Sequence, residues 1–337
     1  MTWSSLLLLA PLLAPVQDAA QPDPWVVYQG GVGPGASKHI VLLAGDEEYR
    51  SEEALPMLAR ILSVHHGFKC TVLFSTNPED GTIDPTNQTN VPGMEQLATA
   101  DMLIVFFRFR ELPDEDMQHF VDYVESGKPI LGIRTSTHAF DYKRNKDSKF
   151  ARYHWRGGDW KDGFGRQILG ETWISHHGGH GSQSTRGVVE PGSEGHPILK
   201  GLLDVWGPTD VYGTRELPAG TQVLLRGQVV QGMRPDDPPA VGEKNDPMMP
   251  LVWVREFEGP EGKPTRAICS TIGASVDMQS AGLRRLLVNA CYWGMRLEER
   301  MPDESRVDYV GAYEPTTFGF DKWTRGRRAA DFALKGD

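Results

Sequence analysis

The stretch GKPILGIRTSTH at residues 127–138 runs from a short apolar segment straight into a polar turn. A buried strand that ends in a sharp turn has the form of a nucleophile elbow, which presents one reactive side chain at the edge of a sheet. Arg134 occupies the position of the nucleophile. A guanidinium stays protonated and is no nucleophile at ordinary pH. We therefore expect this turn to bind or polarise a ligand rather than to form a covalent intermediate.

The segments around this stretch alternate between strand-like and helical patterns. Continuous apolar runs predict strands at 40–44, 70–74, 102–107 and 129–133. Apolar residues recur with helical spacing at 51–66 and 114–126. Strands that alternate with helices predict an α/β fold, in which a mostly parallel sheet is covered by helices on both faces.

The second half of the chain has looser patterns but continues the same domain. Strand-like runs, which we expect to extend and cap the sheet, occur at 172–175, 223–230, 251–257 and 267–272. A long helix follows, with an apolar face made of Leu283, Leu286, Leu287, Ala290 and Cys291. The predicted organisation has four parts: a signal peptide at 1–20, an irregular lead-in at 21–37, one α/β domain at 38–300, and a C-terminal tail at 301–337 packed on the body.

The composition excludes several classes of partner. A chain of 337 residues, 39% of them hydrophobic, can bury one large core. Its formal net charge of −10 would repel nucleic acid and anionic membranes. The apolar stretch at 6–16 is too short to span a bilayer and is typical of a signal-peptide core. We therefore expect an exported protein, periplasmic or extracellular, whose mature chain does not insert into a membrane. The oligomeric state stays open between a monomer and a homo-oligomer.

Charged and polar residues follow three of the predicted strands. In an open parallel sheet, ligands bind beyond the carboxyl ends of the strands, where the strand order reverses. In a flavodoxin-like order three loops would converge there: 45–50, 108–110 and 134–138. Arg108, Arg134 and His138 are the strongest candidates, because each follows an apolar strand and does not easily point into the core. The remaining charges of this rim could instead pair with one another: Glu47, Glu48, Arg50 and Arg110.

Three histidines lie within five residues, at His176, His177 and His180. Imidazole is a good ligand for zinc and other transition metals, and catalytic zinc sites commonly use three protein ligands. Adjacent residues of an extended segment point to opposite sides, so only one of the first two histidines can join His180 unless the backbone turns. We assign a divalent metal such as zinc to His177 and His180. The alternative is a histidine-lined polar pocket without an ion.

Aromatic residues gather around the same loops: Trp155, Trp160, Trp173, Trp206, Tyr212 and Trp253. Flat rings beside charged groups suit a sugar, whose C–H face stacks on a ring while its hydroxyls form hydrogen bonds. We expect Trp155 and Tyr212 to contact such a ligand. Trp173 and Trp253 lie within strand-like runs, so we expect them to be buried.

Several stretches together resemble one known family over about residues 39–295: 45–53, 132–140, 157–180, 250–253 and 270–273. That family is the ThuA-like (trehalose-utilisation) proteins of the class I glutamine amidotransferase-like superfamily. The resemblance implies a flavodoxin-like three-layer sandwich and a role in carbohydrate metabolism, with trehalose or 3-keto sugars as substrates. Glutamine amidotransferase chemistry is excluded, because Arg134 stands where a cysteine would attack.

Three functions remain open. The first is a sugar-converting enzyme that hydrolyses or eliminates by acid–base chemistry, with His138 or His180 as proton carrier and Asp46 or Glu47 as partner carboxylate. Its substrate would be held by Glu48, Arg108, Arg134, Thr135, Trp155 and Tyr212. The second is a noncatalytic carbohydrate-binding protein on the same scaffold. The third is a metal-dependent hydrolase that uses the histidine cluster.

Overall fold

The computed structural model describes residues 23–334, so the predicted signal peptide at 1–20 lies outside the described residues. The strands of the main sheet are β1 (Trp25–Tyr28), β2 (His39–Gly45), β3 (Lys69–Phe74), β4 (Met102–Phe107), β5 (Ile130–Ile133), β7 (Thr185–Val189), β8 (Val205–Gly207), β10 (Thr221–Val229), β11 (Met249–Glu258) and β12 (Pro264–Ser270). A separate two-stranded sheet pairs β6 (Ser175–His176) with β9 (Tyr212–Gly213).

The α-helices are α1 (Ser51–His66), α2 (Asp114–Glu125) and α3 (Ala281–Gly294). Shorter helical turns are η1 (Met94–Thr99), η2 (Arg134–His138), η3 (Ala151–Tyr153), η4 (Gly165–Leu169), η5 (Pro197–Leu199), η6 (Asp277–Gln279), η7 (Glu298–Arg300) and η8 (Ala329–Phe332). Within residues 23–334 no helix has the length and apolar character needed to cross a membrane.

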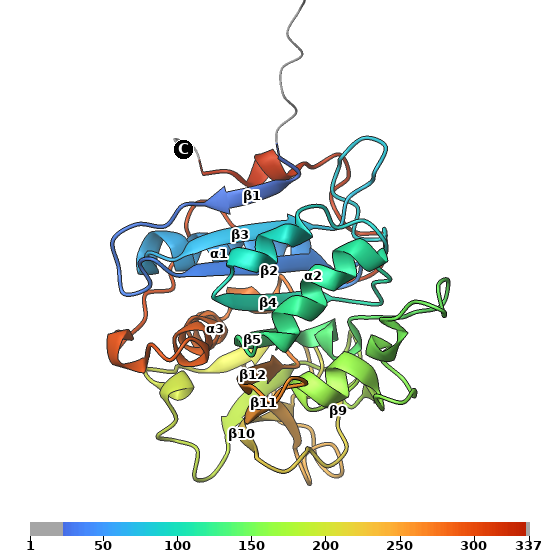
Figure 1. Ribbon diagram of the computed structural model, residues 1–337. Coiled ribbons are helices and arrows are strands. Elements are labelled where there is room, and N and C mark those ends of the chain that lie inside the picture. The colour runs from blue at the N-terminus through green and yellow to red at the C-terminus, as the bar shows by residue number, and fades with distance from the viewer. Residues whose placement is uncertain (1–22, 335–337) are drawn as a thin grey trace, which may run out of the picture.

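The centre of the main sheet is parallel. Its ten strands follow the order β1-β3-β2-β4-β5-β12-β11-β10-β7-β8 (Figure 1). The five strands β3, β2, β4, β5 and β12 pair in parallel, and their order is that of a flavodoxin-like sheet. The strands outside this centre pair antiparallel, so the whole sheet is mixed. The predicted α/β fold with a parallel core is therefore confirmed, and antiparallel strands extend it.

Helices cover both faces of the sheet, which gives the predicted three layers (Figure 1). Side chains alternate along a strand: Ile40 and Leu42 of β2 join the core with α1 and α3, whereas Val41 and Leu43 join the core with α2. All seven residues of β2 are buried, as expected for a strand covered on both faces. Two separate hydrophobic cores thus hold the sheet in place.

The strand pattern of the second half was predicted less well. Residues 172–174 are irregular, and only β6 follows them, so the predicted strand at 172–175 is wrong. Glu171, which precedes these residues, is buried and accepts hydrogen bonds from the side chains of Arg166 and Arg215. The strands β7 and β8 were not predicted, because β8 has only three residues, β7 is largely half-buried, and neither has a continuous apolar run.

Beyond η7 the chain runs without strands over the described residues up to 334 and lies along the body. The backbone N–H and the hydroxyl of Thr316 donate to the Glu53 carboxylate over 2.8 and 2.7 Å. Tyr28 and Arg60 both donate to the carbonyl of Phe332 over 2.7 Å. This segment therefore passes α1 and reaches β1 at the edge of the sheet.

Candidate active site

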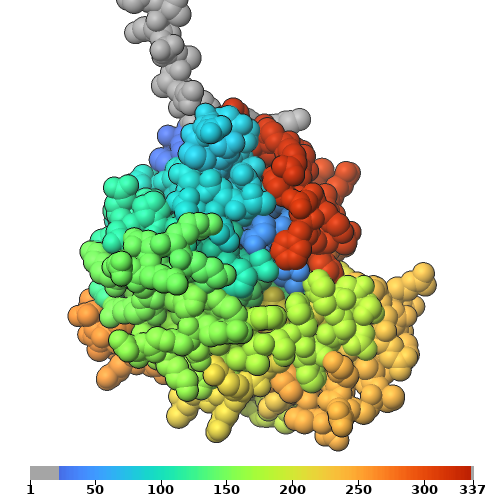
Figure 2. Space-filling view, turned by 90° about the vertical axis from the view of Figure 1, so that its right-hand side faces the viewer, coloured from blue at the N-terminus to red at the C-terminus, as the bar shows by residue number. Residues whose placement is uncertain are grey.

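The three predicted loops meet at the carboxyl ends of the parallel strands, where the order reverses between β2 and β4. The backbone N–H of Arg108 donates to the carbonyl of Gly45 over 2.9 Å, and that of Phe109 donates to the carbonyl of His138 over 3.0 Å. Figure 2 looks onto this edge of the molecule and shows a hollow bordered by the red C-terminal segment, with blue N-terminal residues at its base.

Asp46 joins two of these loops from within the protein. Its Oδ1 accepts hydrogen bonds from the backbone N–H groups of Glu48 and Tyr49, over 2.7 and 2.5 Å, and its Oδ2 accepts the hydroxyl of Thr135. Asp46 and Thr135 are both completely buried. Their contacts give them a positioning role, in place of the predicted catalytic role for Asp46 and substrate-binding role for Thr135.

The Glu47 carboxylate forms ion pairs with two arginines. It pairs with Arg108 and with the buried Arg110, whose Nη2 lies 2.9 Å from Oε2. Burial raises the pKa of Glu47, and the charge of Arg110 opposes this shift. These ion pairs agree with the alternative prediction, in which the charged residues of the rim pair with one another. Both carboxylate oxygens of Glu47 are paired, so the structure does not support its predicted catalytic role.

Arg134 keeps the backbone of an elbow but turns its side chain inward. Its φ of 44° lies in the left-handed region, which is costly for a residue other than glycine. The guanidinium is completely buried between the rings of Tyr49 and Tyr212, at 4.0 and 4.5 Å from their centroids. Its Nη1 donates to the carbonyls of Asp210 and Thr271 over 2.9 and 2.8 Å. The predicted contact between Arg134 and a substrate is therefore wrong, because the side chain has no exposed surface.

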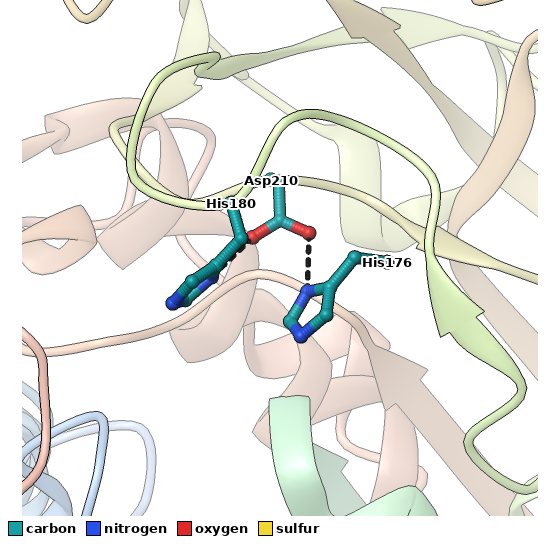
Figure 3. Close-up of side chains that lie close together, drawn as sticks. All are labelled: His176, His180 and Asp210. Atoms are coloured by element: carbon teal, nitrogen blue, oxygen red, sulfur yellow. Dashed lines mark hydrogen bonds and ion pairs between the residues drawn. The ribbon is translucent and has the colours of Figure 1, made fainter.

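Asp210 contacts two histidines, His176 and His180 (Figure 3), and it also contacts Arg134. Nη2 of Arg134 lies 3.2 Å from Oδ1 of Asp210. Nδ1 of His180 lies 3.1 Å from the same oxygen, and Nδ1 of His176 lies 2.7 Å from Oδ2. The carboxylate is completely buried, whereas the side chains of His176 and His180 are 33% and 37% exposed. One carboxylate thus orients two imidazoles whose other edges reach the surface.

The charges of this cluster support one another. Burial alone would raise the pKa of Asp210, but hydrogen bonds to His176 and His180 and the charge of Arg134 bring it well below its usual range. The hydrogen bond to Asp210 raises the pKa of His180 against the effect of burial. Asp210 is therefore ionised at neutral pH and can only accept hydrogen bonds, so each facing Nδ1 carries a proton.

Glu48 faces the other side of His180. Its Oε1 lies 3.4 Å from Nε2 of His180, and its Oε2 lies 3.6 Å from Nε of Arg108. Burial, followed by the nearby charge of Asp46, raises the pKa of Glu48. His180 consequently lies between two carboxylates, and both favour its protonated form.

His177 lies apart from this cluster. Its Nε2 is 2.9 Å from the carbonyl of Lys244, and the Lys244 ammonium donates to the carbonyl of His177. His176, rather than the predicted His177, is the neighbour of His180. As the alternation of side chains predicts, only one of the two adjacent histidines joins His180. That histidine is His176, so the assignment to His177 is wrong.

A metal site can be considered for His176, His180 and Asp210, because these residues offer ligand atoms within 4.8 Å of one another. However, both oxygens of Asp210 are already occupied by imidazole nitrogens, and Arg134 compensates its charge. A divalent cation would have to displace these contacts beside a fixed guanidinium. A resident dication would thus compete with these contacts, and the predicted ligand His177 is absent from the group.

His138 is buried among aromatic rings. The centroids of Phe109 and Trp173 lie 4.9 and 5.6 Å from that of its imidazole. Burial, with the charges of Arg108 and Arg134, holds the pKa of His138 well below its usual range. A neutral, enclosed imidazole is poorly suited to exchange protons with a ligand at neutral pH, so the structure favours His180 over His138 as proton carrier.

Aromatic side chains line the wall beside the histidines. Trp155 is half-buried and contacts Phe109 and Trp173, with centroids 5.4 and 6.0 Å apart. Trp173 is also half-buried and lies 5.7 Å from the ring of His176, so its predicted burial is wrong, whereas Trp253 is completely buried as predicted. Tyr212 is buried beneath Arg134 and is not available for the predicted contact with a ligand.

A separate cavity lies beside this rim, between α1 and the C-terminal segment. Its volume is about 370 Å³ and its lining includes Glu52, Arg60, Tyr313 and Phe332. None of the three clustered residues, His176, His180 and Asp210, contributes to its lining. The cavity is thus distinct from the cluster.

Two members of the cluster were missed from the sequence. Asp210 stands in a loop without any recognisable motif, and only its contacts show its position. His176 was named within the histidine run but was not assigned a role. One sequence signal could have favoured His176: side chains alternate along an extended segment, so residues 176 and 180 lie on the same side.

Comparison with known proteins places this fold in a family. The family model for ThuA, described as trehalose utilisation, matches residues 41–294. The chain belongs to the ThuA family. No match is found among curated protein sequences.

Among solved structures, the first one below agrees with this assignment at the level of the fold. A ThuA-like protein of Parabacteroides merdae ATCC 43184 is 14% identical, with a TM-score of 0.50, over 77% of this chain and 90% of its own. A ThuA-like protein of Bacteroides uniformis ATCC 8492 is 16% identical, with a TM-score of 0.49, over 79% and 95%. The glutaminase domain of a Trypanosoma brucei CTPS is 11% identical, with a TM-score of 0.36, over 83% and 98%.

Proposed function

We propose that this ThuA protein is an exported enzyme of carbohydrate utilisation that converts a trehalose-type disaccharide or 3-keto sugar by acid–base chemistry. The observation that carries the proposal is the contact of one buried carboxylate, Asp210, with Nδ1 of both His176 and His180. Export is supported by the apolar stretch at 6–16, and the sugar by the family description.

The arrangement of protons follows from Asp210. Because the carboxylate accepts both Nδ1–H groups, Nε2 is the remaining nitrogen of each histidine for proton transfer. Nε2 of His180 meets Glu48 at 3.4 Å, which favours the imidazolium form. Within residues 23–334 we find no hydrogen-bond partner for Nε2 of His176. His180 is thus suited to donate a proton, and His176 is suited to accept one.

This pair can catalyse an elimination from a 3-keto glycoside. His176 removes the proton from the carbon next to the ketone, and the electrons of that C–H bond form a double bond to the anomeric carbon. The bond from the anomeric carbon to the leaving oxygen breaks, and His180 gives its proton to that oxygen. The proton gained by His176 and the proton lost by His180 balance through solvent. In the hydrolytic form, His176 would take the proton from water instead.

Sugar recognition would come from the aromatic wall. Trp155 and Trp173 are half-buried and adjacent to His138 and His176. Such rings bind the C–H face of a sugar, and Arg108, whose side chain is 17% exposed, is the guanidinium of this rim that can reach a ligand oxygen. These contacts support a small carbohydrate as the partner.

The test is turnover of trehalose and 3-keto-trehalose by the purified protein. His176→Gln and His180→Gln should each lower turnover roughly 10²–10⁴-fold, because each removes one proton-transfer group. His177→Gln is the matched control from the same segment and should retain wild-type activity. Full activity in both site variants would refute the proposal. Saturable sugar binding without product would instead favour a noncatalytic binding protein.

A further inference from the structure

The C-terminal segment beyond the ThuA match contributes a wall to this site. The family match ends at residue 294, yet Phe318 packs against His180 and Tyr49, with centroids 5.4 and 5.6 Å apart. The backbone N–H of Gly319 donates to the carbonyl of Glu48 over 2.7 Å. The red segment that borders the hollow in Figure 2 therefore touches the catalytic groups directly.

This wall is fixed rather than hinged. Thr316 is held by two hydrogen bonds to Glu53 of α1, and its carbonyl accepts the hydroxyl of Ser275 over 3.0 Å. Together with the Gly319 contact, these bonds hold both sides of Phe318. The ring of Phe318 is buried and therefore has a constant position beside His180.

Phe320 continues the wall outward. The guanidinium carbon of Arg108 lies 5.0 Å from the centroid of Phe320 and 4.6 Å from that of Phe109. Arg108 is itself held by Glu47 and Glu48. A fixed guanidinium is thus stacked between two aromatic rings, one of which is open to solvent.

The exposure of Phe320 is unusual in this protein. Its side chain is 52% exposed, and it is the one phenylalanine among residues 23–334 found with a large exposed surface. Single exposed apolar residues need no explanation by themselves. Phe320 differs because it belongs to a continuous aromatic and cationic surface that leads from His138 through Phe109 and Arg108 to the outside.

We infer that Phe320, with Arg108, forms an outer subsite for the second ring of a glycoside whose first ring is bound at His176 and His180. The inference rests on the proposed function. Phe320 follows Phe318 by two residues and is far more exposed, so it lies on the outer part of the wall. Its exposed face can stack on the C–H face of the nonreacting ring, and Arg108 can donate to that ring's hydroxyls.

The experiment compares a two-ring probe with a one-ring probe. Phe320→Ala should raise KM and Kd for 3-keto-trehalose about three- to tenfold, the range of an aromatic contact, and should leave methyl 3-keto-α-glucoside unchanged. Phe320→Tyr keeps the ring and should behave as wild type. Val64→Ala, which also removes a half-exposed apolar side chain but near the far end of α1, is the matched control.

The outcomes separate this subsite from the reaction itself. Equal effects of Phe320→Ala on both probes, or no effect on either, would overturn the subsite. The proposed function would still stand in that case if the wild-type protein turns the probes over. If neither probe is turned over, the enzymatic proposal fails, but calorimetry still tests the subsite. Weaker binding of 3-keto-trehalose by Phe320→Ala, with unchanged binding of the one-ring probe, would support the subsite. Unselective binding in that case overturns both.

Discussion

Replacing Asp210 with asparagine keeps its shape but removes the charge on which both imidazoles and Arg134 depend. In the wild type, Nδ1 of His176 and of His180 lie 2.7 and 3.1 Å from its oxygens, and Nη2 of Arg134 lies 3.2 Å from Oδ1. Asparagine offers one acceptor oxygen and turns an NH₂ donor toward the remaining N–H groups. At least one of the three contacts must therefore be lost.

The expected cost has a structural and a catalytic part. Removing one partner of a buried ion pair costs about 3–5 kcal/mol. Arg134 retains two backbone carbonyls and two tyrosine rings, so we expect about 3 kcal/mol, a fall in Tm on the order of 5–10 °C. Turnover should fall roughly 10²–10⁴-fold, because the imidazoles lose their orientation and tautomer.

The decisive measurement is the NMR titration of the histidine ring protons, which needs no substrate. The hydrogen bond to Asp210 is the main cause of the raised pKa of His180, whereas burial and Arg134 lower it. In Asp210→Asn the pKa of His180 should therefore fall. Asp204→Asn is the control, since this carboxylate is 57% exposed in its pair with Arg186 and such pairs contribute little. An unchanged His180 titration in a folded Asp210→Asn protein would refute the assignment of the cluster.

Three further predictions concern the pH dependence of activity, the need for a metal, and the stability contribution of Glu52. The raised pKa of His180 extends its protonated form to higher pH, so kcat should decline only above about pH 6.5, and a decline that is complete below that pH would contradict His180 as the acid. Dialysis against a chelator should leave activity unchanged, because Asp210 is already compensated by Arg134; loss of activity that zinc restores would show that a metal is required. Burial raises the pKa of Glu52 to about 8. Its contribution to stability is therefore complete below the unfolded pKa of 4.5 and is lost as the pH rises to about 8. Glu52→Gln should flatten this dependence, whereas Glu115→Gln, an exposed control, should leave it unchanged; urea unfolding at pH 5 and 8 measures both.

The centre of the fold could be predicted from the sequence because its signals are local. The central strands β2 and β4 are continuous apolar runs bounded by polar turns, and α1 and α2 show apolar faces with helical spacing. The strands β7 and β8 carry no such run, since they lie near the edge of the sheet and depend on pairing with β10 and with each other. Their formation is a tertiary effect that the sequence pattern does not contain.

The meeting of three loops could also be predicted, but not the orientation of their side chains. That the loops at 45–50, 108–110 and 134–138 meet follows from strand order alone. Whether a charged residue in such a loop faces a ligand depends on partners from elsewhere in the chain. Asp46 is satisfied by Thr135, and Glu47 by Arg110, and neither pairing leaves a periodic trace in the sequence.

The elbow explains how the ThuA scaffold can hold a site without a nucleophile at the usual position. Arg134 adopts the backbone that would present a reactive side chain, but Tyr49, Tyr212 and Asp210 provide a buried place for its guanidinium. The charge at the elbow consequently stabilises the ionised Asp210, and Asp210 orients the two exposed imidazoles. The imidazoles that we propose as reactive groups therefore lie one contact away from the elbow, on loops that the elbow residue contacts through Asp210.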